Sequence, residues 1–341
     1  MNARATDGDK VVQAEKAIFY YRSLDSLTIR SLRRKLTHWY DQAKRDLPWR
    51  KTRDPYAIWI SEVMLQQTRV AAVIPYYECF LQRFPTAASL AQSPEPELLA
   101  MWAGLGYYSR ARNLQKAAQQ IAASGTFPKD YESILTLPGV GTYTAAAIAS
   151  ISFGLPHAAV DGNVKRVLAR WTNDAHVDPQ PTADRLLDPR DPARWNQAVM
   201  ELGATICLPR DPRCTECPVA RDCAAHQAGT QNDLPLKRAK PTPEQLDRTL
   251  LVIRRNGSIL LTPSPRVAGF WDLPEHFPQA RAGAKLGEFR HTITHRHYRF
   301  TVREATTRTT PVESRWHTQE ELGSIPLSTT AKKALRIYNA L

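Results

Sequence analysis

Residues 135–153 read LTLPGVGTYTAAAIASISF, and this stretch decides the fold of the N-terminal part of the chain. A helical pattern over residues 131–136 precedes the turn Leu137–Gly141, and a second one over 142–152 follows it. Gly139 and Gly141 permit a tight turn, and they leave backbone N–H groups bare at the start of the second helix. The stretch therefore predicts two helices joined by a short hairpin.

Bare N–H groups at a helix start can bind a phosphate oxygen without reading the base. An ordinary glycine-containing helix connection is the alternative, and the small residues after the turn favour the DNA-binding hairpin. The chain holds 46 Lys and Arg against 33 Asp and Glu, a formal charge of +13. A polyanion such as DNA or RNA is a common partner of so basic a protein, although a basic genome-wide composition explains the charge as well.

Outward from the hairpin, residues 25–228 follow a mainly helical pattern, and residues 1–24 before them are expected to be an N-terminal tail. The first long helical stretch, 56–84, is expected to break at Pro75. The further helices are expected over these ranges: 96–105, 109–123, 131–137, 142–153 and 163–171.

Residues 229–247 are polar, basic and proline-containing, so they are expected to be a linker. The pattern then changes to that of a smaller α+β domain over 248–341. Short apolar runs flank Asn256-Gly257, which is a hairpin signal, and Tyr298, Phe300 and Val302 alternate with polar residues as in a half-buried strand. A final helix is expected over 329–341.

The chain has 341 residues, of which 43% are hydrophobic and 23% charged, the balance of a globular protein. No apolar run of eighteen residues occurs, so no membrane span is expected. The first twenty residues do not resemble a secretory signal. We therefore expect a cytoplasmic protein that does not bind a membrane. We also expect it to be a monomer and to associate with the nucleoid.

Four of the five cysteines are clustered with the spacing C-x6-C-x2-C-x5-C, namely Cys207, Cys214, Cys217 and Cys223. In a reducing compartment such a cluster favours a metal over disulfides. Four thiolates can hold a zinc ion or an iron–sulfur cube, and spacing alone leaves both open. The fifth, Cys79, lies on a helical run over 74–84 and is expected to be a buried, small apolar residue.

Two carboxylates stand in positions that suit catalysis. Glu62 lies within an apolar helical stretch, where burial would favour its protonated form and suit a general acid. A partly exposed glutamate at the edge of that helix face is the plain alternative. Asp161 precedes the helical stretch 163–171, as a helix N-cap does, and the helix N-terminus would favour its ionised form. One protonated and one ionised carboxyl group can together break a glycosidic bond.

These features, in this order, resemble the endonuclease III superfamily of helix–hairpin–helix DNA glycosylases and, within it, the MutY family of adenine DNA glycosylases. The resemblance covers residues 25–228 and is carried by the strings LPWR (47–50), SEVMLQQT (61–68), GLGYY (104–108), RARNL (110–114) and DGNV (161–164). It implies a mainly α, two-lobed fold. It also implies a monofunctional hydrolase of base excision repair that removes adenine mispaired with 8-oxoguanine or guanine in double-stranded DNA.

The resemblance implies roles for single residues. Glu62 would protonate adenine at N7, and Asp161, placed by Asn163, would stabilise the cationic sugar. Tyr143 would support the site by hydrogen bonding, where lyase relatives carry a nucleophilic lysine.

Further roles follow from the same resemblance. Arg50 and Leu65 would line the adenine pocket, and Gln67 and Tyr107 would fill or wedge the duplex, whereas Tyr108 would serve helix packing. The four clustered cysteines would hold a structural [4Fe–4S] cluster.

The C-terminal region resembles the Nudix-like domain that checks the base opposite adenine in this family. Two segments carry the likeness, GFWDLPE (269–275) and FRHTITH (289–295). Thr294 and His295 would meet 8-oxoguanine. Ile293 replaces the family's aromatic residue, so the ring that would stack is missing, and Thr294 replaces the family's serine but keeps a hydroxyl group. No glutamate-rich Nudix box occurs, so metal-dependent pyrophosphate cleavage is not expected.

Two other functions compete with this one. A pyrimidine glycosylase with lyase activity, or a thymine-mismatch glycosylase, would share the superfamily fold. Tyr143 counts against the lyase, and the C-terminal domain counts against both. A non-enzymatic DNA-binding protein would have no need of Glu62 and Asp161.

Overall fold

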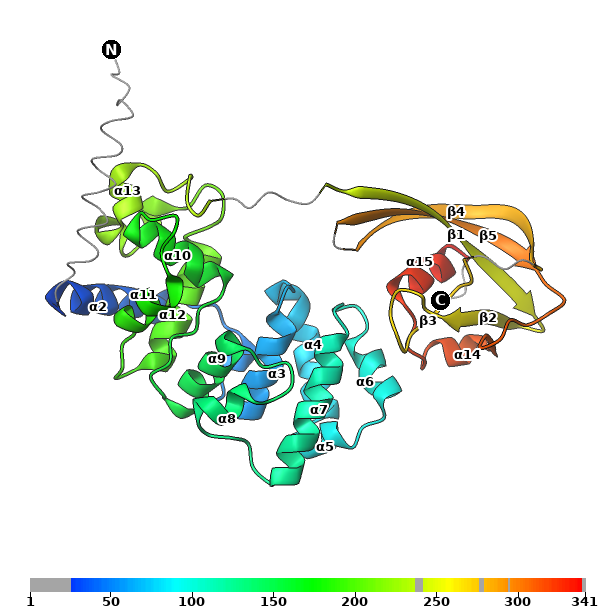
Figure 1. Ribbon diagram of the computed structural model, residues 1–341, viewed down its shortest axis with the longest axis horizontal. Coiled ribbons are helices and arrows are strands. Elements are labelled where there is room, and N and C mark those ends of the chain that lie inside the picture. The colour runs from blue at the N-terminus through cyan, green and yellow to red at the C-terminus, as the bar shows by residue number, and fades with distance from the viewer. Residues whose placement is uncertain (1–25, 237–241, 276–278, 294, 339–341) are drawn as a thin grey trace, which may run out of the picture. The chain divides into compact units, whose positions relative to one another are not determined.

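The computed structural model describes residues 26–236, 242–275, 279–293 and 295–338, so the expected tail over 1–24 lies outside the described residues (Figure 1). The N-terminal part is helical, as predicted. Its helices in order are α2 (Ser26–Ala43), η1 (Pro48–Arg50), α3 (Pro55–Leu65), α4 (Val70–Arg83), α5 (Ala87–Ala91), α6 (Glu95–Trp102), α7 (Ser109–Ser124), α8 (Tyr131–Leu135), α9 (Thr142–Phe153), α10 (Gly162–Thr172), α11 (Pro179–Leu186), α12 (Pro192–Thr205), η2 (Cys214–Glu216), η3 (Ala220–Asp222) and α13 (Ala224–Ala228).

The break in the first long helical stretch was placed wrongly at Pro75. Helix α4 continues through Pro75, and the chain turns between Leu65 and Val70, where Gln67 has a φ of 58°. A proline in the second turn of a helix loses one hydrogen bond near the helix start and can be accommodated there. The left-handed residue ends the helix more sharply than the proline does.

Cys79 is exposed, so its predicted burial was wrong. On α4 the buried positions include Val73, Tyr77 and Phe80. Cys79 lies next to Phe80 in sequence, but about 100° further round the helix, on the face that points to solvent. The helical run was correct, and the choice of its buried face was not.

One core cluster of the helical part joins α2, α10 and α12. Leu32, Leu36 and Tyr40 recur every four residues on α2 and are all buried. They pack with Val167 and Trp171 of α10. Cys223 belongs to this cluster, and Cys207 and Cys217 pack against it. The helices that carry the core therefore also position the cysteine loop, residues 207–223.

The C-terminal part forms a six-stranded sheet in the order β3-β2-β1-β5-β4, with β6 paired to β2. The strands are β1 (Glu244–Arg255), β2 (Ser258–Pro263), β3 (Trp271–Asp272), β4 (Arg281–Ile293), β5 (Arg296–Thr306) and β6 (Arg315–His317). Strands β1 and β5 are parallel, and β1 with β2 and β4 with β5 are antiparallel. Strand β1 begins at Glu244, four residues before the expected domain start.

The predicted hairpin at Asn256-Gly257 is confirmed. These two residues have φ values of 48° and 77° and connect β1 to β2, with Arg255 opposite Ser258. Two successive left-handed residues suit the twist of a tight hairpin, which explains the Asn-Gly pair.

Two helices, α14 (Gln319–Leu322) and α15 (Thr329–Ile337), follow the strands, and both contribute buried side chains to one core cluster with the sheet. Tyr298, Phe300 and Val302 of β5 are buried in the core that α15 completes with Ala334 and Leu335. The alternating strand and the final helix are therefore confirmed, up to the end of the described residues. The fold is the predicted one, a helical part followed by an α+β part.

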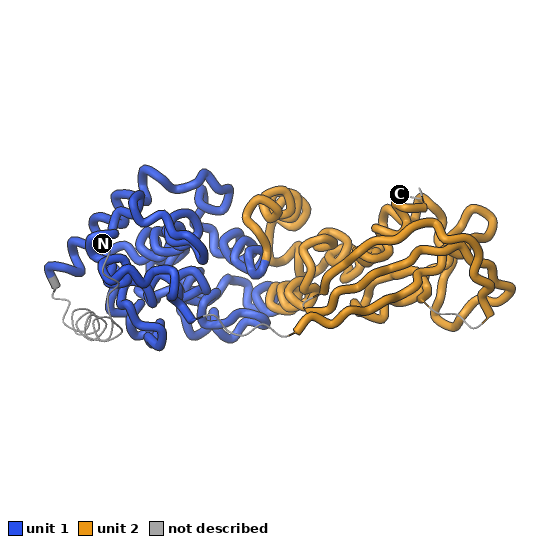
Figure 2. The backbone as a smooth tube through the Cα atoms, turned by 90° about the horizontal axis from the view of Figure 1, so that it is seen from above, with its two compact units in different colours: residues 1–67, 120–238 blue, residues 68–119, 239–341 orange. Residues whose placement is uncertain are grey.

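The contacts divide the chain into two compact units, residues 1–67 with 120–238 and residues 68–119 with 239–341 (Figure 2). The second unit therefore combines α4, α5, α6 and most of α7 with the C-terminal sheet. Within it the Tyr108 ring contacts Phe270 at 4.1 Å between centroids, so Tyr108 does pack, but its ring partner is not on a helix. The boundaries at 228 and 248 stay a prediction. No helix within the described ranges is long and apolar enough to cross a bilayer.

Candidate active site

Glu62 is buried on α3, with 6% of its surface exposed. The start of the helix is stabilised by its N-cap, because the Asp54 side chain accepts hydrogen bonds from the backbone N–H groups of Tyr56 and Ala57. Pro55 occupies the first helical position, where no N–H group is needed. All residues from Tyr56 to Met64 are buried. Burial in this apolar helix raises the pKa of Glu62 to about 7. The carboxyl group can therefore hold or give up a proton near neutral pH, as a general acid requires.

Tyr143 joins α9 to Glu62. Its hydroxyl donates to Glu62 Oε2 at 2.7 Å and also lies 3.3 Å from Met200 Sδ. Burial beside Glu62 holds the pKa of Tyr143 well above its ordinary value, so the phenol stays protonated. The hydrogen bond lowers the pKa of Glu62, and this partly opposes the effect of burial.

Asp161 caps α10, as predicted: its Oδ1 accepts from the backbone N–H of Val164 at 2.7 Å. Its Oδ2 accepts from Asn163 Nδ2 at 2.9 Å. Burial raises the pKa of Asp161, and these hydrogen bonds together with the charge of Arg166 oppose that rise. The negative charge of Asp161 in turn raises the pKa of Glu62, which shows that the two carboxyl groups share one electrostatic environment.

A chain of hydrogen bonds connects Asp161 to the cysteine loop. Arg166 Nε donates to the carbonyl oxygen of Cys207 at 2.8 Å, and its Nη2 donates to Asn163 Oδ1 at 2.9 Å and to the Gly203 carbonyl at 2.7 Å. Asn163 completes the chain to Asp161. The orientation of the carboxylate therefore depends on the backbone position of the first clustered cysteine.

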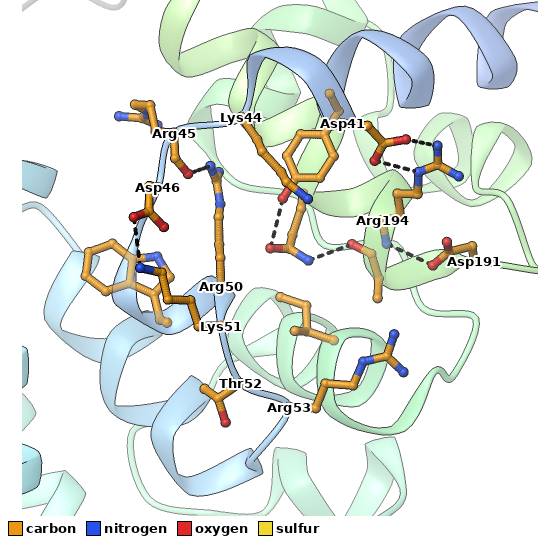
Figure 3. Close-up of a pocket in the computed structure, with 15 residues that line it drawn as sticks. Asp41, Lys44, Arg45, Asp46, Arg50, Lys51, Thr52, Arg53, Asp191 and Arg194 are labelled. Atoms are coloured by element: carbon orange, nitrogen blue, oxygen red, sulfur yellow. Dashed lines mark hydrogen bonds and ion pairs between the residues drawn. The ribbon is translucent and has the colours of Figure 1, made fainter.

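Arg50 extends from η1 beside a cavity of about 460 Å³ that it lines together with Tyr40 (Figure 3). Figure 3 shows its guanidinium reaching the backbone oxygen of Arg45, at 3.0 Å. Its Nη2 lies 2.7 Å from Glu201 Oε2. The positive charge of Arg50 lowers the pKa of Glu62, so the predicted pocket residue also acts on the predicted acid.

The three other predicted base and duplex contacts lie at helix ends. Leu65 is the last residue of α3, and Gln67 follows it in the left-handed conformation. Tyr107, in the second unit, has a φ of 48° and leaves 48% of its surface exposed. Large side chains on left-handed residues are uncommon, because this backbone conformation strains them.

The predicted hairpin connects α8 to α9. Gly139 has a φ of 78°, which a side chain would strain, and Val140 N–H donates to the Leu137 carbonyl. Gly141 is the N-cap of α9 with a φ of −99° that any residue adopts. The backbone conformation at position 141 therefore does not require a glycine. No described atom lies within 4 Å of where a Cβ at this position would stand. The absence of a side chain leaves the helix start open.

The four clustered cysteines line one cavity, namely Cys207, Cys214, Cys217 and Cys223. Burial and the neighbouring thiols raise the pKa of Cys217 to about 12 and that of Cys223 to about 11. In the described ranges, no three Cys, His, Asp or Glu side chains are close enough to hold one metal ion.

Arg170 also lines this cavity and is 1% exposed. Its Nη1 donates to Cys207 Sγ at 3.2 Å and to the Leu208 carbonyl at 2.6 Å. Its Nη2 is buried and has no hydrogen-bond partner among the described residues. A buried cation beside four sulfur atoms suits an anionic group bound by them.

One of the two predicted lesion contacts can be placed: His295 lies between the end of β4 and the start of β5. Thr294 lies outside the described residues, and His295 is exposed.

The sequence reasoning missed three charged residues that hold the site together: Arg45, Arg166 and Glu201. Each looks like a surface residue in sequence. The signal that could have found Glu201 is its place beside the buried Leu202, within a helix that leads into the cysteine loop. Arg166 could have been found from its spacing, since three residues after Asn163 place it one turn further along the same helix face.

Comparison with known proteins agrees with this arrangement. The model of a family described as "HhH-GPD superfamily base excision DNA repair protein" matches residues 60–189, which include Glu62, the hairpin and Asp161. Two solved structures share the fold. A thermostable thymine-DNA glycosylase has a TM-score of 0.55 and 29% identity, covering 58% of this chain and 96% of that one. An endonuclease III in a non-covalent DNA complex has a TM-score of 0.53 and 25% identity, covering 61% of this chain and 99% of that one.

The human protein named "Adenine DNA glycosylase" is 34% identical to this chain. The alignment covers 98% of this chain and 79% of the human protein, so it includes the C-terminal sheet as well as the helical part. Identity over nearly the whole length, together with the repair-family match, shows that this chain belongs to the adenine DNA glycosylases, DNA-binding enzymes of base excision repair.

Proposed function

We propose that this enzyme hydrolyses the N-glycosidic bond of adenine mispaired with 8-oxoguanine or guanine, and that it leaves an abasic site without cutting the strand. The observation that carries the proposal is the buried Glu62, which accepts a hydrogen bond from Tyr143 and is acted on by the charge of Asp161. Glu62 has a pKa of about 7 and Asp161 is held by a helix start. This is a pair of carboxyl groups in different environments, as glycosidic cleavage requires.

In the proposed reaction, adenine leaves the base stack at a cost of a few kcal/mol. The Glu62 carboxyl group gives its proton to adenine N7 while the bond between N9 and C1′ breaks. The bonding electron pair leaves with the adenine, and the sugar becomes a cation. The Asp161 carboxylate stabilises this cation or bonds to it transiently. A water molecule then attacks C1′, and its proton returns to Glu62.

Tyr143 supports the monofunctional assignment. A lysine at this position could form a Schiff base with the opened sugar and cleave the strand. A phenol cannot form a Schiff base, and here it donates its proton in a hydrogen bond to Glu62. Lys165 follows Asp161 by four residues and is the amine that could trap the product adventitiously.

For the cofactor, we propose that the four clustered cysteines hold a [4Fe–4S] cluster. Thiolates on a cube each bind a different iron and stand further apart than ligands of one ion. Here all four thiols line one cavity together with the buried guanidinium of Arg170, which suits an anionic cluster held by them. When bound, the cluster would supply structure, by fixing the loop that Arg166 links to Asp161.

The proposed DNA contacts follow the same logic. The open start of α9 would hold a phosphate, and Gln67 and Tyr107 would fill the space that the flipped base leaves. Thr294 and His295 would read the base opposite adenine.

The test is single-turnover cleavage of duplexes that carry adenine opposite 8-oxoguanine, adenine opposite guanine, or thymine opposite guanine. We expect cleavage only after alkali, fastest on the first duplex and not detectable on the third. Strand cleavage without alkali would contradict the monofunctional mechanism. Removal of thymine in place of adenine would assign the enzyme to the thymine-mismatch branch.

Chemical analysis of iron and sulfide tests the cluster, and zinc without sulfide would exclude it.

A further inference from the structure

Glu201 is a wholly buried acid on α12 that has no part in the reaction described above. Its side chain is 0% exposed. Its Oε1 accepts from Arg45 Nε at 2.8 Å and from the Arg45 backbone N–H at 3.1 Å. Its Oε2 accepts from Nη2 of both Arg45 and Arg50 at 2.7 Å. One carboxylate thus connects two guanidinium groups.

Arg50 is held from three sides. Glu201 accepts one hydrogen bond from it, the Arg45 carbonyl oxygen accepts another at 3.0 Å, and the Tyr40 ring lies 5.4 Å from the guanidinium carbon. The Arg50 side chain is only 13% exposed. Its charge is therefore fixed in position and is only partly screened by water.

The charged and titratable groups that act on Glu62 come from three elements. They are Tyr143 of α9, Asp161 at the start of α10 and Arg50 of η1. Arg50 in turn faces Glu201 of α12, Arg45 of the segment before η1 and Tyr40 of α2. A bare guanidinium near Glu62 would favour the ionised carboxylate, which cannot donate a proton.

We propose that Glu201 is a positioning residue for Glu62, because it holds the Arg50 guanidinium in place and offsets its charge so that Glu62 stays protonated near neutral pH. This inference rests on the proposed role of Glu62 as the proton donor. It assigns to the α12 carboxylate a part in setting the pH range of the reaction.

The direction of the effect follows from the charges. Removing the negative charge of Glu201 leaves the positive charge of Arg50 without its anion. This favours the ionised form of Glu62. Excision needs the protonated form, so the alkaline limb of the pH–rate profile would move to lower pH. Rates at pH 5 would stay near those of the wild type, whereas rates at pH 8 would fall.

The experiment measures single-turnover adenine excision from pH 5 to 9, at saturating enzyme, for wild type, Glu201→Gln and Glu201→Asp. For Glu201→Gln we expect the alkaline limb to move down by about 0.5–1 pH unit, which lowers the rate at pH 8 by about 3–10-fold. Glu201→Asp retains the charge and should retain the limb. Leu202→Ala, a neutral change of the next buried residue, should lower the melting temperature without moving the limb. An equal rate loss at every pH in Glu201→Gln would overturn the proposal.

Arg45→Gln is the second variant, in case Glu201→Gln does not fold. The Arg45 side chain is 38% exposed, so its loss is easier to tolerate. It leaves Glu201 with one guanidinium fewer and makes the surroundings of Arg50 more negative. The alkaline limb should therefore move to higher pH, opposite to the Glu201→Gln shift. A limb that stays in place in Arg45→Gln would also overturn the proposal.

Glu62→Gln separates this inference from the function on which it rests. If Glu62→Gln keeps the wild-type rate and limb, Glu62 is not the proton donor and the proposed mechanism fails. If Glu62→Gln loses activity but the Glu201 and Arg45 variants keep the wild-type limb, the mechanism stands and only the role of Glu201 fails.

Discussion

Glu62 and Glu201 are buried in the same compact unit, yet their surroundings push their pKa values in opposite directions. Glu62 lies in the apolar interior of α3 with one neutral donor, the Tyr143 hydroxyl, and its pKa is about 7. Glu201 lies between α12 and η1 with two guanidinium groups, and its pKa is about 2. Burial is the largest effect on both groups and acts upward on both. The partners therefore decide which acid keeps its proton.

The comparison separates a group that can react from a group that holds others in place. A carboxyl group with one neutral partner can change its protonation state during a reaction. A carboxylate that accepts four hydrogen bonds from two arginines cannot, because losing its charge would leave two guanidinium groups without their anion. The first arrangement suits catalysis and the second suits structure.

The largest expected effect is that of replacing Glu62, the acid that changes its protonation state during the reaction. Glu62→Gln removes the proton donor but keeps the side-chain shape and an acceptor for Tyr143. We expect the single-turnover rate of adenine excision to fall by about 10²–10⁴-fold, the usual worth of general acid catalysis. DNA binding, measured by fluorescence anisotropy, should change little. A rate within threefold of the wild type would contradict the assignment.

The next effect is on the structural side. Glu201→Gln should lower the free energy of unfolding at pH 7 by about 3–5 kcal/mol, since it leaves two guanidinium groups without their anion. The depressed pKa of Glu201 contributes stability that is complete above its ordinary value of 4.5 and is lost as the pH falls toward 2. The difference between variant and wild type in urea unfolding should therefore shrink below pH 4.5. A constant difference down to pH 3 would argue against ionisation as its source.

Glu62 should show the opposite linkage. Its pKa is raised in the folded state, so the folded state holds the proton more tightly than the unfolded chain and loses stability as the pH rises from 4.5 to 7. Glu62→Gln is free of this loss. It should be more stable than the wild type at pH 8 by up to about 3 kcal/mol, and no more stable at pH 4. Urea unfolding at both pH values measures this, and equal stabilities at pH 8 would contradict a buried, raised Glu62.

The smallest effect concerns the hydrogen bond that the Tyr143 hydroxyl donates to Glu62. Tyr143→Phe removes a donor that lowers the pKa of Glu62. The alkaline limb of the excision rate should move to higher pH by about half a unit, with a rate loss of about tenfold or less at pH 6. The shift is opposite to that of Glu201→Gln. A downward shift in Tyr143→Phe would show that the hydroxyl acts on some other group.

Much of the local structure could be predicted from the sequence. Helix α9 was predicted with its bounds, and in the structure Gly141 is its N-cap and Gly154 its C-cap. The N-cap role of Asp161 and the Asn-Gly hairpin were predicted because both depend on residues adjacent in the chain. The break at Gln67 was missed because it comes from a left-handed backbone conformation that a glutamine does not signal. The exposure of Cys79 was missed because it depends on which face of α4 meets its neighbours.

By itself the sequence determined the elements, the hairpin turn, the family resemblance and the identity of Glu62, Tyr143 and Asp161 as candidate site residues. Only the tertiary structure decided the charges around them. Tyr143 meets Glu62 across 81 positions, and Arg50 meets Glu201 across 151. Local pattern reports periodicity and turn chemistry, which act over a few residues. The pKa of a buried acid depends on burial and on charges that folding brings within a few ångströms, so it had to come from the fold.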